Sequence, residues 1–167
     1  MEFGELVKIR RSCRSFLDEK VLLEDIEKIM ETAIQAPSWK NSQTGRYYVA
    51  LSDEAIDEIY SDLPDFNQNS SKNAAYIVCT FKKGISGGGD DNWGAYDLGL
   101  QNSYMMLRAS ELGYDTLIMG LRDEDKIRKY FEIPDDEIML PVIAIGKRNG
   151  DCRLRTRIDS KDIFKTK

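Results

Sequence analysis

Apolar residues recur at intervals of three and four along much of this chain, the spacing that places them on one face of an α-helix. The clearest case lies between residues 22 and 34, where Ile26, Ile29 and Ala33 share a face. Pro37 then ends the helix, because proline cannot continue the hydrogen-bond ladder. The same spacing predicts further helices over residues 3–10, 52–60, 93–112 and 123–131.

Shorter stretches rich in apolar, β-branched and aromatic residues predict strands at residues 46–51, 74–81, 115–120 and 138–146. Pro141 lies inside the last of these. Proline lacks the N–H that a sheet ladder uses, so we expect this strand at a sheet edge or at a bulge. The helices and strands do not alternate regularly. This order favours an α+β fold with a mixed, mainly antiparallel sheet flanked by helices.

Two polar stretches between these elements are expected to be loops. Residues 64–73 combine three asparagines with serine and lysine neighbours. Residues 84–89 are glycine-rich but do not match the G-x-G-x-x-G pattern of nucleotide-binding turns. Asp90 and Asp91 would also repel a pyrophosphate from the N-terminus of the next helix. We therefore interpret residues 84–89 as a flexible connection.

Length and composition fit one domain over residues 1–167, with residues 147–167 as a basic C-terminal tail. The net charge is −5, which argues against nucleic acid as a partner because that binding depends on neutralising phosphates. No apolar run approaches the roughly 20 residues of a membrane span. The N-terminus also lacks the basic and apolar regions of a signal peptide. We expect a cytoplasmic protein with no membrane partner.

The chain contains no histidine, which removes Ser-His-Asp and Cys-His triads and the common zinc sites. We expect no metal site. The three cysteines, Cys13, Cys79 and Cys152, are widely spaced and odd in number. This pattern indicates reduced thiols rather than a disulfide framework, with Cys13 as a small residue in a turn.

Three arginines and two serines are concentrated between residues 10 and 15 of this otherwise acidic protein. A guanidinium group is planar, always charged and carries its donors in a fixed fork that suits phosphate oxygens. Hydroxyl donors beside it would complete a pocket for a phosphoryl group. The alternative is a solvated basic turn with no ligand, and the arginines alone do not decide between the two.

Four stretches in a fixed order resemble the nitroreductase family of flavoproteins. They are residues 10–16 (RRSCRSF), 36–43 (APSWKNSQ), 97–102 (DLGLQN) leading to 111–113 (ELG), and 118–120 (IMG). The first two in tandem are the more specific, whereas the later two would be weak alone. The resemblance extends from about residue 10 to residue 146 and loosely into the tail.

This resemblance implies an α+β fold and a homodimer that holds one FMN in each of two sites shared between the subunits. It also assigns roles to individual residues. The FMN phosphate and ribityl chain would be held by Arg10, Arg11, Ser12 and Arg14, with Arg155 and Arg157 of the tail closing over the phosphate. The flavin would be contacted from the partner subunit by Pro37, Ser38, Trp39 and Asn41, with Gln43 nearby. Met119 and Gly120 would run along the isoalloxazine edge, where a backbone N–H can donate to the flavin.

The implied activity is an FMN-dependent oxidoreductase that takes electrons from NADH or NADPH. A nitroaromatic, quinone or similar acceptor would then bind in the same space, giving ping-pong kinetics. No catalytic side chain is required, because the cofactor carries the chemistry. Two alternatives stay open: a flavin carrier without turnover, and a related flavin enzyme that performs dehalogenation or flavin fragmentation.

The chain departs from the family pattern at Thr44-Gly45, where many members have Pro-Trp. Glycine adds backbone freedom, and threonine replaces a stiff apolar wall with a small polar side chain. We therefore expect a mobile loop and a more open pocket above the flavin. Trp39 has its own alternative, since it could simply pack beneath the loop.

Overall fold

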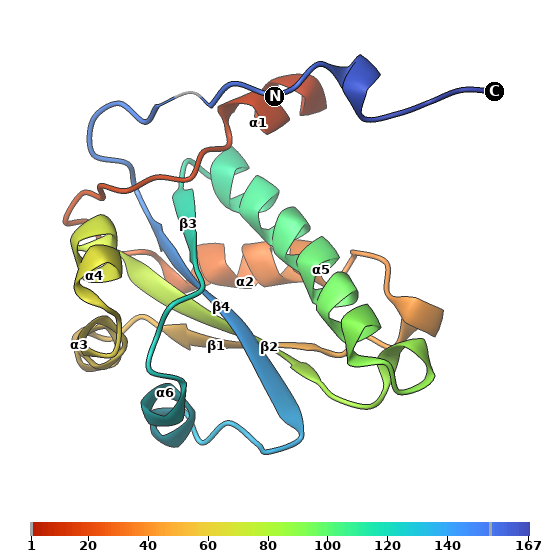
Figure 1. Cartoon of the computed structure of the whole chain (residues 1–167). Coiled ribbons are helices and arrows are strands. Elements are labelled where there is room, and N and C mark those ends of the chain that lie inside the picture. Colours follow the sequence, from red (N-terminus) through yellow and green to blue (C-terminus); the bar gives the residue numbers. More distant parts are fainter. Residues whose placement is uncertain (1, 154) are drawn as a thin grey trace.

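The computed structural model describes residues 2–153 and 155–167. A four-stranded sheet lies at its centre, with strand order β1-β2-β4-β3 and antiparallel pairing throughout (Figure 1). The strands are β1 (Gly45–Ala50), β2 (Ala75–Lys82), β3 (Asp115–Met119) and β4 (Glu137–Gly146). The helices are α1 (Phe3–Ile9), α2 (Leu23–Ala33), α3 (Asp53–Ser61), α4 (Asp65–Ser71), α5 (Asp91–Glu111) and α6 (Glu124–Tyr130). Short 3₁₀ turns occur at η1 (Trp39–Asn41), η2 (Ser86–Gly88) and η3 (Ser160–Asp162).

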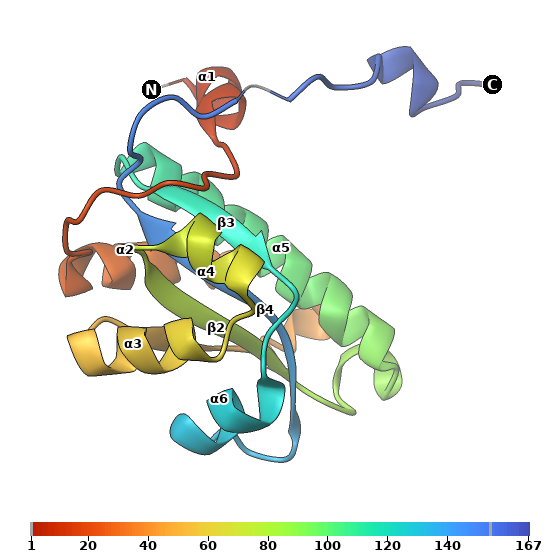
Figure 2. The ribbon, with the colours of Figure 1, turned by 60° about the vertical axis from the view of Figure 1, so that its left-hand side comes forward.

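Helices cover both faces of the sheet. On one face, α2 and α5 pack against strand residues such as Ile77 and Ile143. On the other, α3 and α6 pack against Tyr76 and Val142, and Figure 2 shows α3, α4 and α6 together on this side. Neighbouring residues of one strand point to opposite faces, so Tyr76 and Ile77 belong to different cores. The α+β prediction is confirmed, and the parallel component is reduced to a single bridge between Ser12 and Thr116.

Residues 64–73 correct the sequence prediction, because they contain helix α4 rather than a loop. Pro64 precedes its first turn, where the missing N–H costs nothing, and Asp65 lies within that turn. The buried face of α4 is polar, formed by Asn67, Ser70 and Ser71. Ser71 Oγ donates to the carbonyl of Asn67 at 2.7 Å. Hydrogen bonds, not apolar burial, hold this helix, so hydrophobic periodicity could not reveal it.

β4 pairs with β2 on one side and β3 on the other, so it is not an edge strand over its whole length. β3 pairs only with residues 142–146, however, so the segment that holds Pro141 pairs with β2 alone. The alternative of a bulge is confirmed. The register between β2 and β4 shifts between Val78 and Thr80, opposite the proline. The irregularity removes the need for the N–H that proline lacks.

The glycine-rich residues 84–89 form an ordered connection built around η2 rather than a free loop. Gly84, Gly87, Gly88 and Gly89 all adopt positive φ angles. At Gly87 a side chain is also excluded by space, because a Cβ there would lie 2.3 Å from Cδ1 of Trp93. Among the described residues, none of the helices is long and apolar enough to cross a membrane.

Candidate functional site

The arginine-rich segment is fixed by its backbone at the start of β3. Cys13 N–H donates to the carbonyl of Thr116 at 3.0 Å, and Leu17 N–H donates to that of Lys147 at 2.8 Å. Cys13 and Phe16 are buried and anchor the segment in the core, whereas Ser12 before them and Arg14 and Ser15 between them are exposed. The chain therefore presents its polar side chains outward from a fixed backbone.

Positive charges at this segment are close enough to repel one another. Burial, followed by the charges of Arg157 and Arg11, lowers the pKa of Arg10. Asp115 opposes this repulsion from beneath and pairs with Arg148, whose Nε lies 3.2 Å from its Oδ2. Asp115 at the cluster and Asp151 in the lining of the adjoining cavity are outnumbered by guanidinium groups, so the cluster carries an excess of positive charge that an anion would neutralise. These guanidinium groups belong to Arg10, Arg11, Arg14, Arg148, Arg153, Arg155 and Arg157.

A cavity of about 230 Å³ lies beside the cluster, between the N-terminal segment and the chain that follows β4. Its lining includes Ser12 and Arg14 on one side and Arg153 and Arg155 on the other. Of the six residues expected to hold a phosphate, Ser12, Arg14 and Arg155 line this cavity. The other three, Arg10, Arg11 and Arg157, are near enough for the charges of Arg11 and Arg157 to lower the pKa of Arg10. We call these six residues the arginine end. Cys13 also lines the cavity, but burial raises the pKa of its thiol, which suits a packed turn residue better than a reactive one.

Met119 and Gly120 lie at the opposite end of β3 from Ser12, about 13 Å along the strand at the usual rise per residue. The Met119 side chain is buried in the core, so it can offer only its backbone to a ligand. Gly120 is exposed and follows the strand directly. β3 therefore joins the arginine end to the segment expected along the flavin edge.

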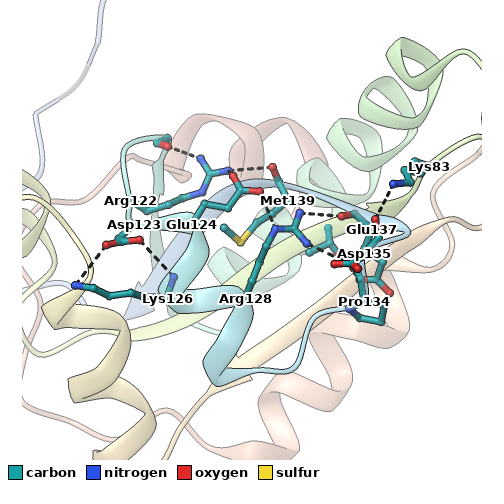
Figure 3. Close-up of polar contacts among 12 residues, drawn as sticks. Lys83, Arg122, Asp123, Glu124, Lys126, Arg128, Pro134, Asp135, Glu137 and Met139 are labelled. Carbon is teal, nitrogen blue, oxygen red and sulfur yellow. Dashed lines mark hydrogen bonds and ion pairs between the residues drawn. The ribbon is translucent and has the colours of Figure 1, made fainter.

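Two side chains that the sequence analysis did not single out hold the backbone after β3. Arg122 Nη1 donates to the carbonyl of Gly120, and Asn67 Nδ2 from α4 donates to that of Leu121 at 2.8 Å. Arg122 in turn bonds Glu124 at 2.9 Å and the carbonyl of Met139 at 2.9 Å (Figure 3). For Arg122, the one signal in the sequence was its position two residues after Gly120, which the resemblance places along the flavin edge. Asn67 had none, because the polar helix that carries it was expected to be a loop.

Residues 37–43 form a loop at the other end of the molecule with an unusual backbone. Lys40, Asn41 and Gln43 adopt positive φ angles of 45°, 57° and 48°. Left-handed backbone is uncommon for residues other than glycine and costs free energy where lysine or glutamine adopts it. Ser38 Oγ accepts the Gln43 N–H at 3.1 Å and braces the turn. We call residues 37–43 the tryptophan loop.

The arginine end and the tryptophan loop lie at opposite ends of α5 (Figure 1). The loop is bonded to Asp97 in the first third of the helix. The arginine end adjoins β3, which begins shortly after the helix ends at Glu111. The helix between Asp97 and Glu111 spans roughly 20 Å at 1.5 Å per residue. One chain therefore does not bring the two predicted groups to a common pocket.

Thr44 and Gly45 are packed rather than mobile, which corrects the expectation for this departure from the family pattern. Thr44 is 1% exposed. A Cβ on Gly45 would lie 1.8 Å from Oε1 of Gln101 on α5. Gly45 therefore serves the close approach of β1 to α5, and no open pocket is created there.

The geometry can be compared with known proteins. The model of the nitroreductase family matches residues 7–76 and 62–147, and the chain belongs to this family. An Archaeoglobus fulgidus protein provisionally named NADH dehydrogenase/NAD(P)H nitroreductase is 26% identical over 146 residues, covering 85% of this chain and 83% of that protein.

Two solved structures share the fold. An oxidoreductase containing FMN is 26% identical with a TM-score of 0.79, covering 90% of this chain and 79% of that one. An Exiguobacterium sibiricum protein, provisionally named a nitroreductase and solved in complex with FMN, is 24% identical. Its TM-score is 0.87, with coverage of 100% of this chain and 98% of that one.

Proposed function

We propose that this protein is an FMN-dependent oxidoreductase that takes electrons from NADH or NADPH and passes them to small acceptors such as nitroaromatics or quinones. The observation that carries the proposal is the arginine end, where guanidinium groups beside a 230 Å³ cavity outnumber the nearby carboxylates of Asp115 and Asp151. A phosphate group fits this excess of positive charge and the fork geometry of arginine. Family membership and the FMN named for two similar structures support the assignment of this phosphate to FMN.

Each group of residues has a distinct task in this proposal. Arg10, Arg11 and Arg14 bind the phosphate with Ser12, while Arg155 and Arg157 close over it from the tail. The backbone N–H of Gly120 would donate to the edge of the ring system, and the backbone there is held by Arg122, which donates to the carbonyl of Gly120, and by Asn67, which donates to that of Leu121. FMN, when bound, supplies the hydride chemistry, and the residues of the chain position it and exclude water. Reductant and acceptor would use the same space in turn, which gives ping-pong kinetics.

We also propose a homodimer in which the tryptophan loop of one subunit covers the FMN held by the arginine end of the other. The separation of roughly 20 Å along α5 supports this arrangement, since one chain cannot use both groups on one ligand. Exposed apolar side chains offer a surface for association. Phe3 is 67% exposed, and with Leu6 of α1 and Leu107 of α5 it lines a shallow cavity of about 360 Å³. The cytoplasmic location and the reduced state of the cysteines in the cell remain predictions.

The test is anaerobic reduction of the purified protein. We expect it to bind FMN and to lose the 450 nm flavin absorbance when NADH or NADPH is added, with recovery on adding a quinone. Bound FMN that neither nicotinamide reduces would favour the flavin carrier. Absence of flavin binding would overturn the proposal.

A further inference from the structure

The buried carboxylate of Asp97 joins three segments that are distant in sequence. Its Oδ2 accepts the backbone N–H of Trp39 at 3.0 Å, the hydroxyl of Ser86 at 2.9 Å and, more weakly, the hydroxyl of Ser42 at 3.5 Å. Trp39 and Ser42 belong to the tryptophan loop, Ser86 belongs to η2, and Asp97 lies on α5. Asp97 is 3% exposed, so these bonds form away from solvent.

The three donors to Asp97 are neutral groups. A carboxylate removed from water is costly unless hydrogen bonds satisfy it, and bonds to a charged acceptor are stronger than bonds between neutral groups. Serine hydroxyls reinforce the arrangement, since Ser42 Oγ and Ser86 Oγ also lie 3.2 Å apart. The network is therefore formed within one chain, and its bond between Ser86 and Asp97 is buried.

The network acts on the part of the loop that is conformationally unfavourable. Lys40, Asn41 and Gln43 hold positive φ angles directly after the Trp39 N–H that Asp97 accepts. Such backbone persists only where surrounding contacts determine it. η2 supplies a rigid support, because Gly87 lies directly against the ring of Trp93 on α5.

We infer that Asp97 is a positioning residue, which holds the tryptophan loop in its left-handed conformation and so sets how tightly the flavin ring is bound. The inference rests on the proposed function for its ligand, but the hold on the loop is a property of the protein alone. Asp97 does not reach the phosphate, which belongs to the arginine end. Loss of the Asp97 carboxylate should weaken the binding of every flavin that carries the ring, whether or not the flavin carries a phosphate.

The test compares Asp97→Ala and the milder Asp97→Asn with the matched control Asp91→Ala. Asp91 is also an acidic residue of α5 that accepts a backbone N–H, from Gly84 at 2.8 Å, but it does not contact the tryptophan loop. In the flavin-free protein, we expect amide hydrogen exchange at Trp39 to rise about tenfold in Asp97→Ala, because the bond to a charged acceptor is lost. Asp97→Asn should give a smaller rise, and Asp91→Ala should accelerate exchange at Gly84 only.

Flavin binding provides the second readout. We expect Asp97→Ala to weaken the binding of FMN and of riboflavin by the same factor, about five- to tenfold, as for the loss of one or two hydrogen bonds. The thermal midpoint identifies variants that are globally unfolded, and Asp97→Asn replaces Asp97→Ala if the latter does not fold. Unchanged exchange at Trp39, or flavin affinities equal to the parent, would overturn the inference. Failure of the parent to bind any flavin would instead overturn the proposed function.

Discussion

The arginine end and the tryptophan loop are built on opposite principles. At the arginine end, the backbone is held by one bridge to β3 and another to Arg148 after β4, while the guanidinium groups repel one another beside an open cavity. At the tryptophan loop, the backbone itself is unfavourable, but its polar groups are satisfied within the chain by Asp97 and Ser38. In the proposed function, a ligand would complete the first region electrostatically, whereas the second is organised by the chain itself. The arginine end therefore suits tight binding of an anion, and the tryptophan loop suits a preorganised surface for the rest of the ligand.

Removal of one charge from the arginine end should have the largest effect. Hydrogen bonds to charged groups contribute roughly 1.5–3 kcal/mol, so we expect Arg10→Ala to weaken FMN binding by about one to two orders of magnitude. Riboflavin, which lacks the phosphate, should bind the parent weakly and respond little to the substitution. Titration calorimetry with both flavins measures the two effects. Equal losses for FMN and riboflavin would mean that Arg10 does not contact the phosphate.

Packing next to the tryptophan loop should tolerate little additional volume. A Cβ on Gly45 would collide with the Gln101 side chain, which is itself buried. We expect Gly45→Ala to lower the free energy of unfolding by about 1–2 kcal/mol, as for other overpacked sites, with much of the loss recovered in Gly45→Ala/Gln101→Ala. Gly99→Ala is the control, because open space surrounds that helical glycine and alanine favours the helix. Denaturant unfolding tests this, and additive losses in the double variant would contradict the proposed clash.

The smallest expected effect is a change in the reactivity of a cysteine thiol when a ligand binds at the arginine end. Cys152 is partly exposed and lines the 230 Å³ cavity, whereas Cys79 is buried and burial raises the pKa of its thiol. We expect alkylation to reach Cys152 before Cys79, and saturating FMN to slow modification of Cys152 several-fold by covering the cavity. Mass spectrometry of the labelled peptides measures both rates. Protection by riboflavin equal to that by FMN would place the phosphate elsewhere.

Sequence patterns predicted most of the fold, because the α2 and α5 stripes and the β2 and β4 runs bury apolar side chains. The secondary-structure predictions were wrong where hydrogen bonds between polar groups, rather than apolar packing, hold a segment in place. Helix α4 buries Asn67 and Ser71, which no hydrophobic period reveals. The glycine-rich connection at residues 84–89 was predicted to be flexible. It is held in place by the hydrogen bond from Ser86 to Asp97, eleven positions later, which the sequence does not reveal.

The candidate site divides in the same way. Residue chemistry alone made residues 10–14 a candidate anion site, but it did not decide between a ligand and solvent for guanidinium groups concentrated in an acidic chain. The assembly of Arg155 and Arg157 with them depended on the resemblance to a family. The role of Asp97 could not be read from the sequence, since it depends on contacts across 11, 55 and 58 positions. Nor could the packing of Gly45, which depends on how closely β1 approaches α5.

The central claim is that each site takes its arginine end from one subunit and its tryptophan loop from the other. Mixed dimers of Arg10→Ala and Asp97→Ala chains, carrying different tags and purified as heterodimers, test it most directly. If the site is shared, the heterodimer has one FMN site that carries both substitutions and one FMN site that carries neither. We therefore predict that each heterodimer binds one FMN with the affinity of the parent, while both homodimers bind weakly. If every position in the heterodimer binds FMN as weakly as the homodimers do, both halves of the site lie within one chain and the account is contradicted.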